Sequence, residues 1–431
     1  MRLCDFVALR LQVPALLLAL ALSAFALPAF AKQRVVRHPA PAPTPTFSNE
    51  VVRIFQQHCQ TCHREGDIAP FPLMTYADAK PRAALIQFMT ETRQMPPWKP
   101  ADGCGDFRGE RRLSDAEIET LSAWVTAGAP EGDPAQLPPP RQFPSGWTLG
   151  EPDLILSSAE AYTPPPDTDT YRCFTIPTNL VADKFVSAVD THPGDRTTVH
   201  HVLTFIDTTG ESLALDEAEP GPGYTCFGGP GFPTTGTLGG WAPGSPPLEM
   251  PENVAFTLPA ASRVVLQVHY HPHHGESKPD QTQFGVYFSN AASPKEMRIV
   301  PLINDTFTIP PNDARYRVDA ALPIPVPFPL KLWLIAPHMH LLGREMTVEM
   351  KLPDGSTECL IHIGDWDFNW QGAYRYTTPV DVPAGARLSL TAYYDNSSAN
   401  PRNPNDPPQA VSWGEATTDE MCLAFLGVTV E

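Results

Sequence analysis

The sequence is poor in positive charge and in long apolar runs. Among its 431 residues, 30 are Lys or Arg and 48 are Asp or Glu, which gives a formal net charge of -18. Such an acidic chain is a poor partner for nucleic acid or an anionic membrane surface. After residue 31 there is no run of about 18 uncharged apolar residues, so we expect no membrane span and a soluble mature chain.

Helix-favouring periodic stretches are also scarce, whereas proline is abundant, at 51 of 431 residues. Proline interrupts helices and central strands, so the composition favours β-domains joined by long irregular connections. The length suggests two or three domains, each with a core of its own.

The first 31 residues read as a signal peptide. Arg2 and Arg10 precede or flank an apolar run that ends in the small-x-small pattern Ala-Phe-Ala at 29–31. Cleavage after Ala31 implies export, to a bacterial periplasm in the simplest case, where disulfides persist. Loss of Cys4 leaves seven cysteines, so at least one is unpaired or otherwise engaged.

The rest of the chain changes character in steps. Residues 32–47 form a Pro-rich tether, 48–133 have helical character, and 134–146 are a second Pro-rich linker. Short β-type runs then alternate with Pro, Gly, Asn and Asp. They predict two tandem antiparallel β-sandwiches of jelly-roll type, 147–303 and 304–431. The expected fold is therefore mainly β, preceded by a small all-α domain.

Capping signals support the helices of the first domain. Ser48 is placed to cap an initial helix, and Ser114 with Glu117 forms a capping-box pattern before an amphipathic run. Gly128 is expected to end that second helix.

The segment "HCQTCH" contains Cys59-x-x-Cys62-His63, the attachment pattern of c-type haem. Two thiols one turn apart can add to the two vinyl groups, and the next residue presents an imidazole to the iron. Zinc and thioredoxin sites also use CxxC, but an exported chain with an adjacent His and no second CxxC favours haem. The segment resembles small class I cytochromes c.

A sixth haem ligand is expected downstream of this motif. Met95 in "RQMPPWKP" is our prediction, because two prolines fix its loop; Met74 and Met89 are the competitors. Ligation by His and Met raises the haem potential and suits electron transfer.

The later histidines gather in three groups at strand-like runs. They are His200 and His201; His269, His271, His273 and His274; and His338 and His340. Residues i and i+2 of a strand share a face, so His338 and His340 can bind one ion. The adjacent pair His200 and His201 can do so only at a bulge or strand end, or through different ring nitrogens. Such clusters favour Cu, Zn or Fe.

Four motifs in order, "TVHHVLTF", "VLQVHYHP", "PHMHLLG" and "DEMC", give the β-part a specific resemblance. Residues of about 150–431 resemble the copper type II, ascorbate-dependent monooxygenases, the family of peptidylglycine α-hydroxylating monooxygenase and dopamine β-monooxygenase. The resemblance implies two copper ions, one per sandwich, facing each other across a cleft.

The resemblance also implies the ligands and their roles. His200, His201 and His269 would hold a copper that stores and delivers an electron. His338, His340 and Met421 would hold the copper that binds O2 and performs the hydroxylation. A thioether ligand stabilises Cu(I), the state that reacts with O2.

Further pairings come from the same resemblance. It implies disulfides Cys173–Cys226 and Cys359–Cys422, which leaves Cys104 without an assigned partner. His271, His273 and His274 fall outside the family's ligand set. His271 shares a strand face with His269, so it either supports that ligand or competes with it.

One departure concerns the substrate. Peptide-hydroxylating relatives bind a carboxylate with Arg, Asn and Tyr, where this chain has Ala336, Leu423 and Phe425. A carboxylate there would be desolvated without compensation, so we expect an aromatic, alkyl or other weakly polar substrate. The strand period places Leu423 and Phe425 on the face of Met421, and Cys422 on the other face.

The sequence therefore predicts an exported dicopper monooxygenase that hydroxylates a C–H bond of a small organic substrate with O2. Its electrons would pass through the fused haem from a redox protein, ascorbate or another external reductant. Electron flow in the reverse direction and a non-catalytic haem–copper electron carrier or copper-binding protein are the alternatives. A haem-fused copper nitrite reductase would need a Cys, His and Met blue-copper loop, and no cysteine here has a suitable His beside it.

Overall fold

The computed structural model describes residues 44–144, 146–166, 168–271, 277–322 and 326–431. The predicted signal peptide, most of the tether, and His273 and His274 lie outside the described residues. Residues Thr44–Glu431 group into one compact unit. Among the described residues, no helix is both long and apolar enough to cross a membrane.

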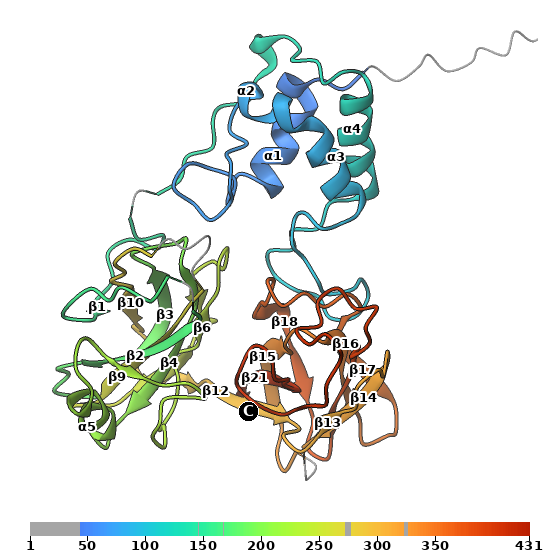
Figure 1. Cartoon of the computed structure of the whole chain (residues 1–431). Coiled ribbons are helices and arrows are strands. Elements are labelled where there is room, and N and C mark those ends of the chain that lie inside the picture. Colours follow the sequence, from blue (N-terminus) through green and yellow to red (C-terminus); the bar gives the residue numbers. More distant parts are fainter. Residues whose placement is uncertain (1–43, 145, 167, 272–276, 323–325) are drawn as a thin grey trace, which may run out of the picture. The chain divides into compact units, whose positions relative to one another are not determined.

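Short helices precede the strands and pack around one core that includes Phe55, Leu121 and Trp124 (Figure 1). The helices are a π-helix η1 (Phe47–Val51), α1 (Val52–His58), α2 (Tyr76–Ala79), the 3-10 helix η2 (Lys80–Arg82), α3 (Ala83–Glu91), α4 (Asp115–Thr126), the 3-10 helix η3 (Pro134–Gln136) and, within the β-part, α5 (Glu211–Ala218).

The capping signals had different outcomes. Ser114 accepts from the amide of Glu117, whose carboxylate accepts from the amide of Ser114, so the predicted capping box is present. Gly128 adopts φ of 87° just beyond α4, the left-handed conformation that glycine allows at a helix end. The expectation for Ser48 was wrong, because Thr46 is the N-cap and Ser48 is buried inside η1.

The strands outnumber the helices, and the prediction of a mainly β chain is confirmed. They are β1 (Leu154–Ser157), β2 (Thr170–Pro177), β3 (Lys184–His192), β4 (Val199–Asp207), β5 (Tyr224–Thr225), β6 (Gly240–Trp241), β7 (Leu248–Glu249), β8 (Val254–Leu258), β9 (Arg263–Tyr270), β10 (Gln283–Phe288), β11 (Lys295–Glu296), β12 (Arg298–Ile303), β13 (Thr308–Ile309), β14 (Tyr316–Ala321), β15 (Leu330–His338), β16 (Gly343–Lys351), β17 (Thr357–Ile363), β18 (Tyr374–Val382), β19 (Arg387–Tyr394), β20 (Val411–Ser412) and β21 (Leu423–Val430).

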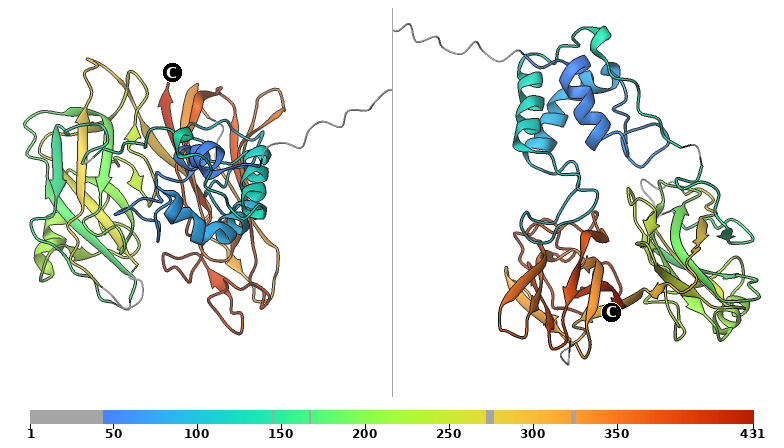
Figure 2. Two further views of the ribbon diagram at one scale, coloured as in Figure 1. Left: turned by 90° about the horizontal axis from the view of Figure 1, so that it is seen from above. Right: turned by 180° about the vertical axis from the view of Figure 1, so that it is seen from behind.

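The first β-region, from β1 to β11, has two layers (Figures 1 and 2). One sheet has the order β1-β10-β3-β8-β11, with β7 beside β3, and the other has the order β5-β2-β9-β4-β6. Side chains of both sheets, among them Phe174, Val186, Leu266 and Phe284, form one core. Val264, Leu266 and Val268 alternate toward that core, as the two-residue period requires.

The second β-region, from β12 to β21, is built in the same way. Its sheets have the orders β12-β21-β15-β18 and β14-β19-β16-β17, and β13 pairs with β20. The change from one region to the next lies at Met297, because β11 pairs with β8 whereas β12 pairs with β21. Strand β12 therefore belongs to the second β-region. The boundary expected from the sequence, after residue 303, had placed it in the first.

A strap from the helical part, residues 98–108, lies on the second β-region. Pro100 forms a β-bridge with Ile363 of β17, and Phe107 forms one with Tyr376 of β18. Since β17 and β18 are the edge strands of different sheets, the strap satisfies backbone groups that both edges leave exposed. Phe107 is buried in the core of that region.

The strap corrects one predicted disulfide. The structure contains Cys173–Cys226, but Cys359 bonds to Cys104, and Cys422 is a buried free thiol. The pairing Cys359–Cys422 was wrong because the strap brings Cys104 beside β17, which carries Cys359. Cys422 instead faces the core between the two sheets.

Candidate metal centres

The first histidine group lies on the neighbouring strands β4 and β9. His201 pairs with His269 across the ladder, and the register shifts between Val199 and His201, so His200 occupies a β-bulge. This bulge turns two adjacent imidazoles to one side of the strand, which is the condition that the sequence set for their binding one ion. The Nδ1 atom of His201 lies 3.2 Å from that of His200 and 3.4 Å from that of His269.

The three rings bring their nitrogen donors together. One ligand nitrogen from each of the three lies within 4.8 Å of the others. Burial lowers the pKa of His201 well below its usual value and also lowers that of His269. Neutral imidazoles keep the lone pair that a metal needs, and three converging nitrogens suit Cu or Zn.

The second histidine group lies at the end of β15. The ring centroids of His338 and His340 are 5.1 Å apart, and burial lowers the pKa of His338 to about 3. Nδ1 of His338 is 2.5 Å from Oε1 of Gln371, and Nδ1 of His340 is 3.1 Å from the carbonyl of Asp419. Both acceptors favour a proton on Nδ1 and a free lone pair on Nε2, the opposite nitrogen from the first group.

Glu420 joins this histidine pair to Met421. Its buried carboxylate accepts the amides of His340 at 2.9 Å, Leu342 at 2.6 Å and Met421 at 3.1 Å. The hydroxyl of Tyr394 donates to the carbonyl of Met421 at 2.7 Å. One carboxylate therefore holds together the two chain segments that carry the predicted ligands. Burial raises the pKa of Glu420 to about 8.

A loop between β17 and β18 contacts both histidine groups. The ring of Phe368 stacks on His200 at 5.7 Å between centroids and meets the ring of His340 at 5.6 Å, nearly at right angles. Trp366 in the same loop donates its indole N–H to the carbonyl of His340 at 3.2 Å. The loop therefore brings one apolar ring into contact with a histidine of each group.

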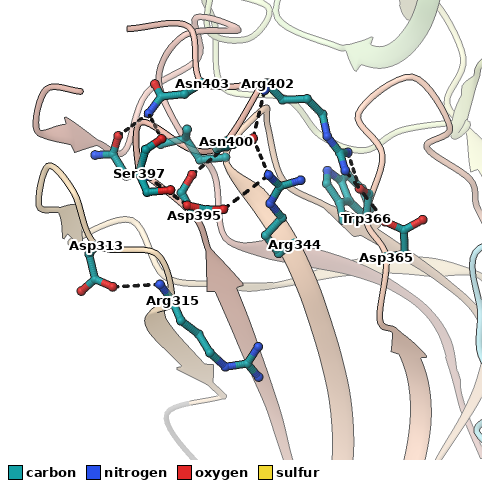
Figure 3. Close-up of polar contacts among 12 residues, drawn as sticks. Asp313, Arg315, Arg344, Asp365, Trp366, Asp395, Ser397, Asn400, Arg402 and Asn403 are labelled. Carbon is teal, nitrogen blue, oxygen red and sulfur yellow. Dashed lines mark hydrogen bonds and ion pairs between the residues drawn. The ribbon is translucent and has the colours of Figure 1, made fainter. Parts of the chain in front are cut away.

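Polar contacts join this loop to neighbouring segments of the same β-region (Figure 3). Arg402 donates to the carbonyl of Trp366 at 2.6 Å, and its guanidinium lies 3.8 Å from the Asp365 carboxylate. The backbone of Arg402 is bonded in turn to Asn400, whose side-chain oxygen also accepts from Arg344. The aromatic loop is therefore attached to β16 and to the segment after β19.

The face beside the second group is apolar. Ala336 pairs with Phe425, and His338 pairs with Leu423, across the ladder of β15 and β21, so the four residues share a face. Met421 and Leu423 are buried, whereas Phe425 is 37% exposed. Strand β12 adds Ile303 next to Leu423 on the same surface.

The CxxCH segment forms a tight turn directly after α1. The amides of Cys62 and His63 both donate to the carbonyl of Cys59, and neither cysteine is in a disulfide. Nδ1 of His63 lies 3.0 Å from the carbonyl of Phe71, which leaves Nε2 as the nitrogen for a metal. The donor set of two free thiols and one oriented imidazole fits a covalently held haem.

Met95 lies elsewhere in the helical part. It borders a cavity of about 650 Å³ together with Trp98 and Ile118, and neither His63 nor the two cysteines are among the described residues that line it. Met74 and Met89 are half-buried. Met95 as sixth ligand stays a prediction.

Several residues of these centres carry no signal that a single sequence reveals. Phe368 and Gln371 lie in a loop far from either His motif in the chain, and only the folding of that loop brings them to the rings. Glu420 directly precedes Met421 in "DEMC", so its position was visible but its role was not.

Comparisons with known proteins bear on the second β-region most directly. Residues 296–427 match the family described as "Copper type II ascorbate-dependent monooxygenase, C-terminal domain". Over 353 residues the chain is 22% identical to human "DBH-like monooxygenase protein 1", a match that covers 74% of this chain and 55% of that protein. The chain thus spans about half the length of this curated relative.

Similarity to solved structures is slight. The infectious bursal disease virus VP2 subviral particle aligns with a TM-score of 0.21 and 11% identity, over 68% of this chain and 75% of that one. PNGF-II aligns with a TM-score of 0.29 and 9% identity, over 64% and 65%. Scores this low carry no argument about the fold. The family match and the human relative support a relation of the second β-region to the copper type II, ascorbate-dependent monooxygenases.

Proposed function

We propose that this protein is an exported dicopper monooxygenase, built from two copper-binding β-sandwiches and a cytochrome c-like domain, that hydroxylates a C–H bond of a small, weakly polar substrate. His200, His201 and His269 would hold one copper, and His338, His340 and Met421 would hold the other. The observation that carries the proposal is the convergence of histidine side chains into two sets, one on each β-region.

Copper, when bound, supplies electron storage at the first centre and oxygen activation at the second. The chain's own residues prepare both centres. Burial lowers the pKa of His338 and His340, and Gln371 and the carbonyl of Asp419 orient the two rings. Phe368 packs an apolar ring against His200 and His340 and so restrains one ring of each set.

The substrate class follows from the face beside His338. Ala336, Leu423 and Phe425 offer no cation and no hydrogen-bond donor from their side chains, so a charged substrate would lose its hydration without compensation. An aromatic or alkyl group can instead bury apolar surface against Phe425 and Leu423. We therefore propose that this surface selects weakly polar substrates and rejects glycine-extended peptides.

The CxxCH segment would bind haem c and pass electrons toward the three-histidine centre. Arg111 donates to the carbonyl of Gly244 at 3.2 Å, and a Cβ on Gly244 would lie 3.4 Å from Sγ of Cys62. Gly244 follows β6, which pairs with β4 next to His201. These contacts support a short route from the haem to the first copper, fed by a redox protein, ascorbate or another reductant.

Copper content, O2 consumption and product formation test the proposal. The protein should hold two copper ions per haem and consume O2 with members of a panel of aromatic and alkyl compounds. Met421→Ile should abolish turnover while the haem spectrum and one copper remain. Met350→Ile, a buried methionine in the core of the same β-region, is the matched control and should retain turnover.

Two results would count against the proposal. Zinc or no metal at the histidine sets would exclude the copper chemistry. Two coppers without substrate-dependent O2 consumption would favour a non-catalytic haem–copper electron carrier on the same scaffold. Rapid turnover of a glycine-extended peptide would contradict the proposed substrate class alone.

A further inference from the structure

His269 is the most enclosed member of the first histidine group, and its two ring nitrogens face different partners. The side chain is 1% exposed. Its Nδ1 faces His201, whereas Nε2 lies 3.5 Å from Oδ2 of Asp169. Nε2 is buried and, among the described residues, makes no complete hydrogen bond. Asp169 is therefore the acceptor that the geometry provides for this nitrogen.

We propose that Asp169 is a positioning residue of the three-histidine centre, which fixes the nitrogen that His269 offers to the metal. The inference rests on the proposed copper centre. A neutral imidazole carries one N–H and one lone pair, and a carboxylate beside Nε2 favours the proton there. The lone pair then lies on Nδ1, toward His200 and His201. A carboxylate behind a ligating histidine also makes that ring a stronger donor.

The strands hold this arrangement in place. Asp169 directly precedes β2, in which Tyr171 pairs with His269 of β9 across the ladder. The Tyr171 ring stacks on the His269 ring at 4.2 Å with an interplanar angle of 5°. The tyrosine limits ring rotation, and the carboxylate sets the direction of the N–H.

His271, two residues after His269, contacts the same carboxylate. Its Nδ1 lies 2.5 Å from Oδ1 of Asp169, so the two carboxylate oxygens face two different imidazoles. The backbone amide of His271 donates to the carbonyl of Thr198 at 2.8 Å, just before β4. We assign His271 to the support of Asp169 rather than to the ligand set of the first copper.

A metal bound by Asp169, His269 and His271 is the competing arrangement. One ligand atom from each of the three lies within 4.8 Å of the others. Such an ion would compete with the first copper for His269, or would need that ring to bridge two ions. The contact between His271 and Asp169 already has hydrogen-bond length, which favours the positioning role.

Copper titration of the haem-loaded, copper-free protein with a competing chelator separates these possibilities. Asp169→Asn should bind two coppers but weaken one of them by about 10- to 100-fold. The reduction potential of that copper should rise, because a weaker imidazole donor stabilises Cu(II) less. His271→Gln should shift both values in the same direction by a smaller amount. Asp169→Glu should recover part of the loss.

Asp190→Asn is the matched control. Asp190 lies 3.2 Å from Nε2 of His192 in the same β-region, and neither residue belongs to a predicted copper set. It should leave both copper affinities unchanged. Unchanged affinity and potential in Asp169→Asn would overturn the inference, as would a third metal equivalent in the wild type that this variant loses. A wild type without copper at the three histidines would overturn the proposed function itself.

Discussion

Replacing Glu420 with Ala should loosen the chain segments around the second histidine group. The carboxylate accepts three buried amides, from His340, Leu342 and Met421. Each buried donor left without a partner costs about 1–3 kcal/mol. The variant also loses the desolvation cost of a buried acid, which offsets part of this. We therefore expect a net local loss of about 2–5 kcal/mol.

Glu420→Gln should cost less, about 1–3 kcal/mol, because its one carbonyl oxygen can still accept two of the three amides. The amides of His340 and Met421 share a single carboxylate oxygen, Oε2, which makes this retention feasible. The comparison of the two variants therefore measures how much of the effect comes from unsatisfied amides.

Hydrogen exchange of the copper-free protein, followed by mass spectrometry, is the direct assay. Peptides covering residues 338–343 and 419–423 should exchange roughly 30- to 4,000-fold faster in Glu420→Ala, since each 1.4 kcal/mol is a factor of ten. Glu415→Gln, in the same loop, is the matched control. Wild-type exchange in Glu420→Ala, or equal acceleration in the control, would refute the reasoning.

Two further predictions concern the scaffold. Cys104→Ser opens a covalent loop of 255 residues and should lower the free energy of unfolding by about 2–5 kcal/mol. Limited proteolysis should then cleave within the strap at 98–108. Cys173→Ser is the control and should leave the strap resistant to the protease. The carboxylate of Asp207 accepts hydrogen bonds from Thr209, Gly210 and Ser212 at the start of α5. Burial by itself raises the pKa of this carboxyl, but the hydrogen bonds from Ser212 and Thr209 outweigh burial and lower it. The stabilisation should be present above the unfolded pKa of about 3.9 and be lost as pH falls below it, so Asp207→Asn should flatten the decline of thermal stability in acid. An unchanged slope would contradict this assignment.

The strand periods were predictable because they depend on local geometry. Within β21, Ala424 faces the core and Leu423 and Phe425 share the other face, as alternation along the strand requires. Cys422 also lies in the core, but β21 begins only at Leu423, so the face of Met421 stays a prediction. From the sequence, a bulge at His200 followed only as a condition: His200 and His201 could bind one ion only if the strand was irregular there. Its occurrence depends on how β4 aligns with β9, which is a pairing between distant segments.

The disulfide of Cys359 could not be predicted from the chain alone. Its partner, Cys104, is 255 residues away and belongs to a segment that we had assigned to a separate helical domain. The strap pairs with β17 and β18 because these edge strands have unpaired backbone groups. Those unpaired groups lie side by side only once the two sheets have formed.

The sequence by itself determined the donor types: imidazoles in three clusters, a thioether beside a cysteine, and two thiols ahead of a histidine. For residues inside regular strands it also determined the face, since side-chain direction there follows from a two-residue repeat. Tertiary structure alone decided which ring nitrogen each histidine presents, because that depends on the acceptor opposite. Asp169 lies behind Nε2 of His269, and Gln371 lies at Nδ1 of His338. Both acceptors come from segments distant in the chain, so packing between elements, and not local pattern, sets the orientation of the two centres.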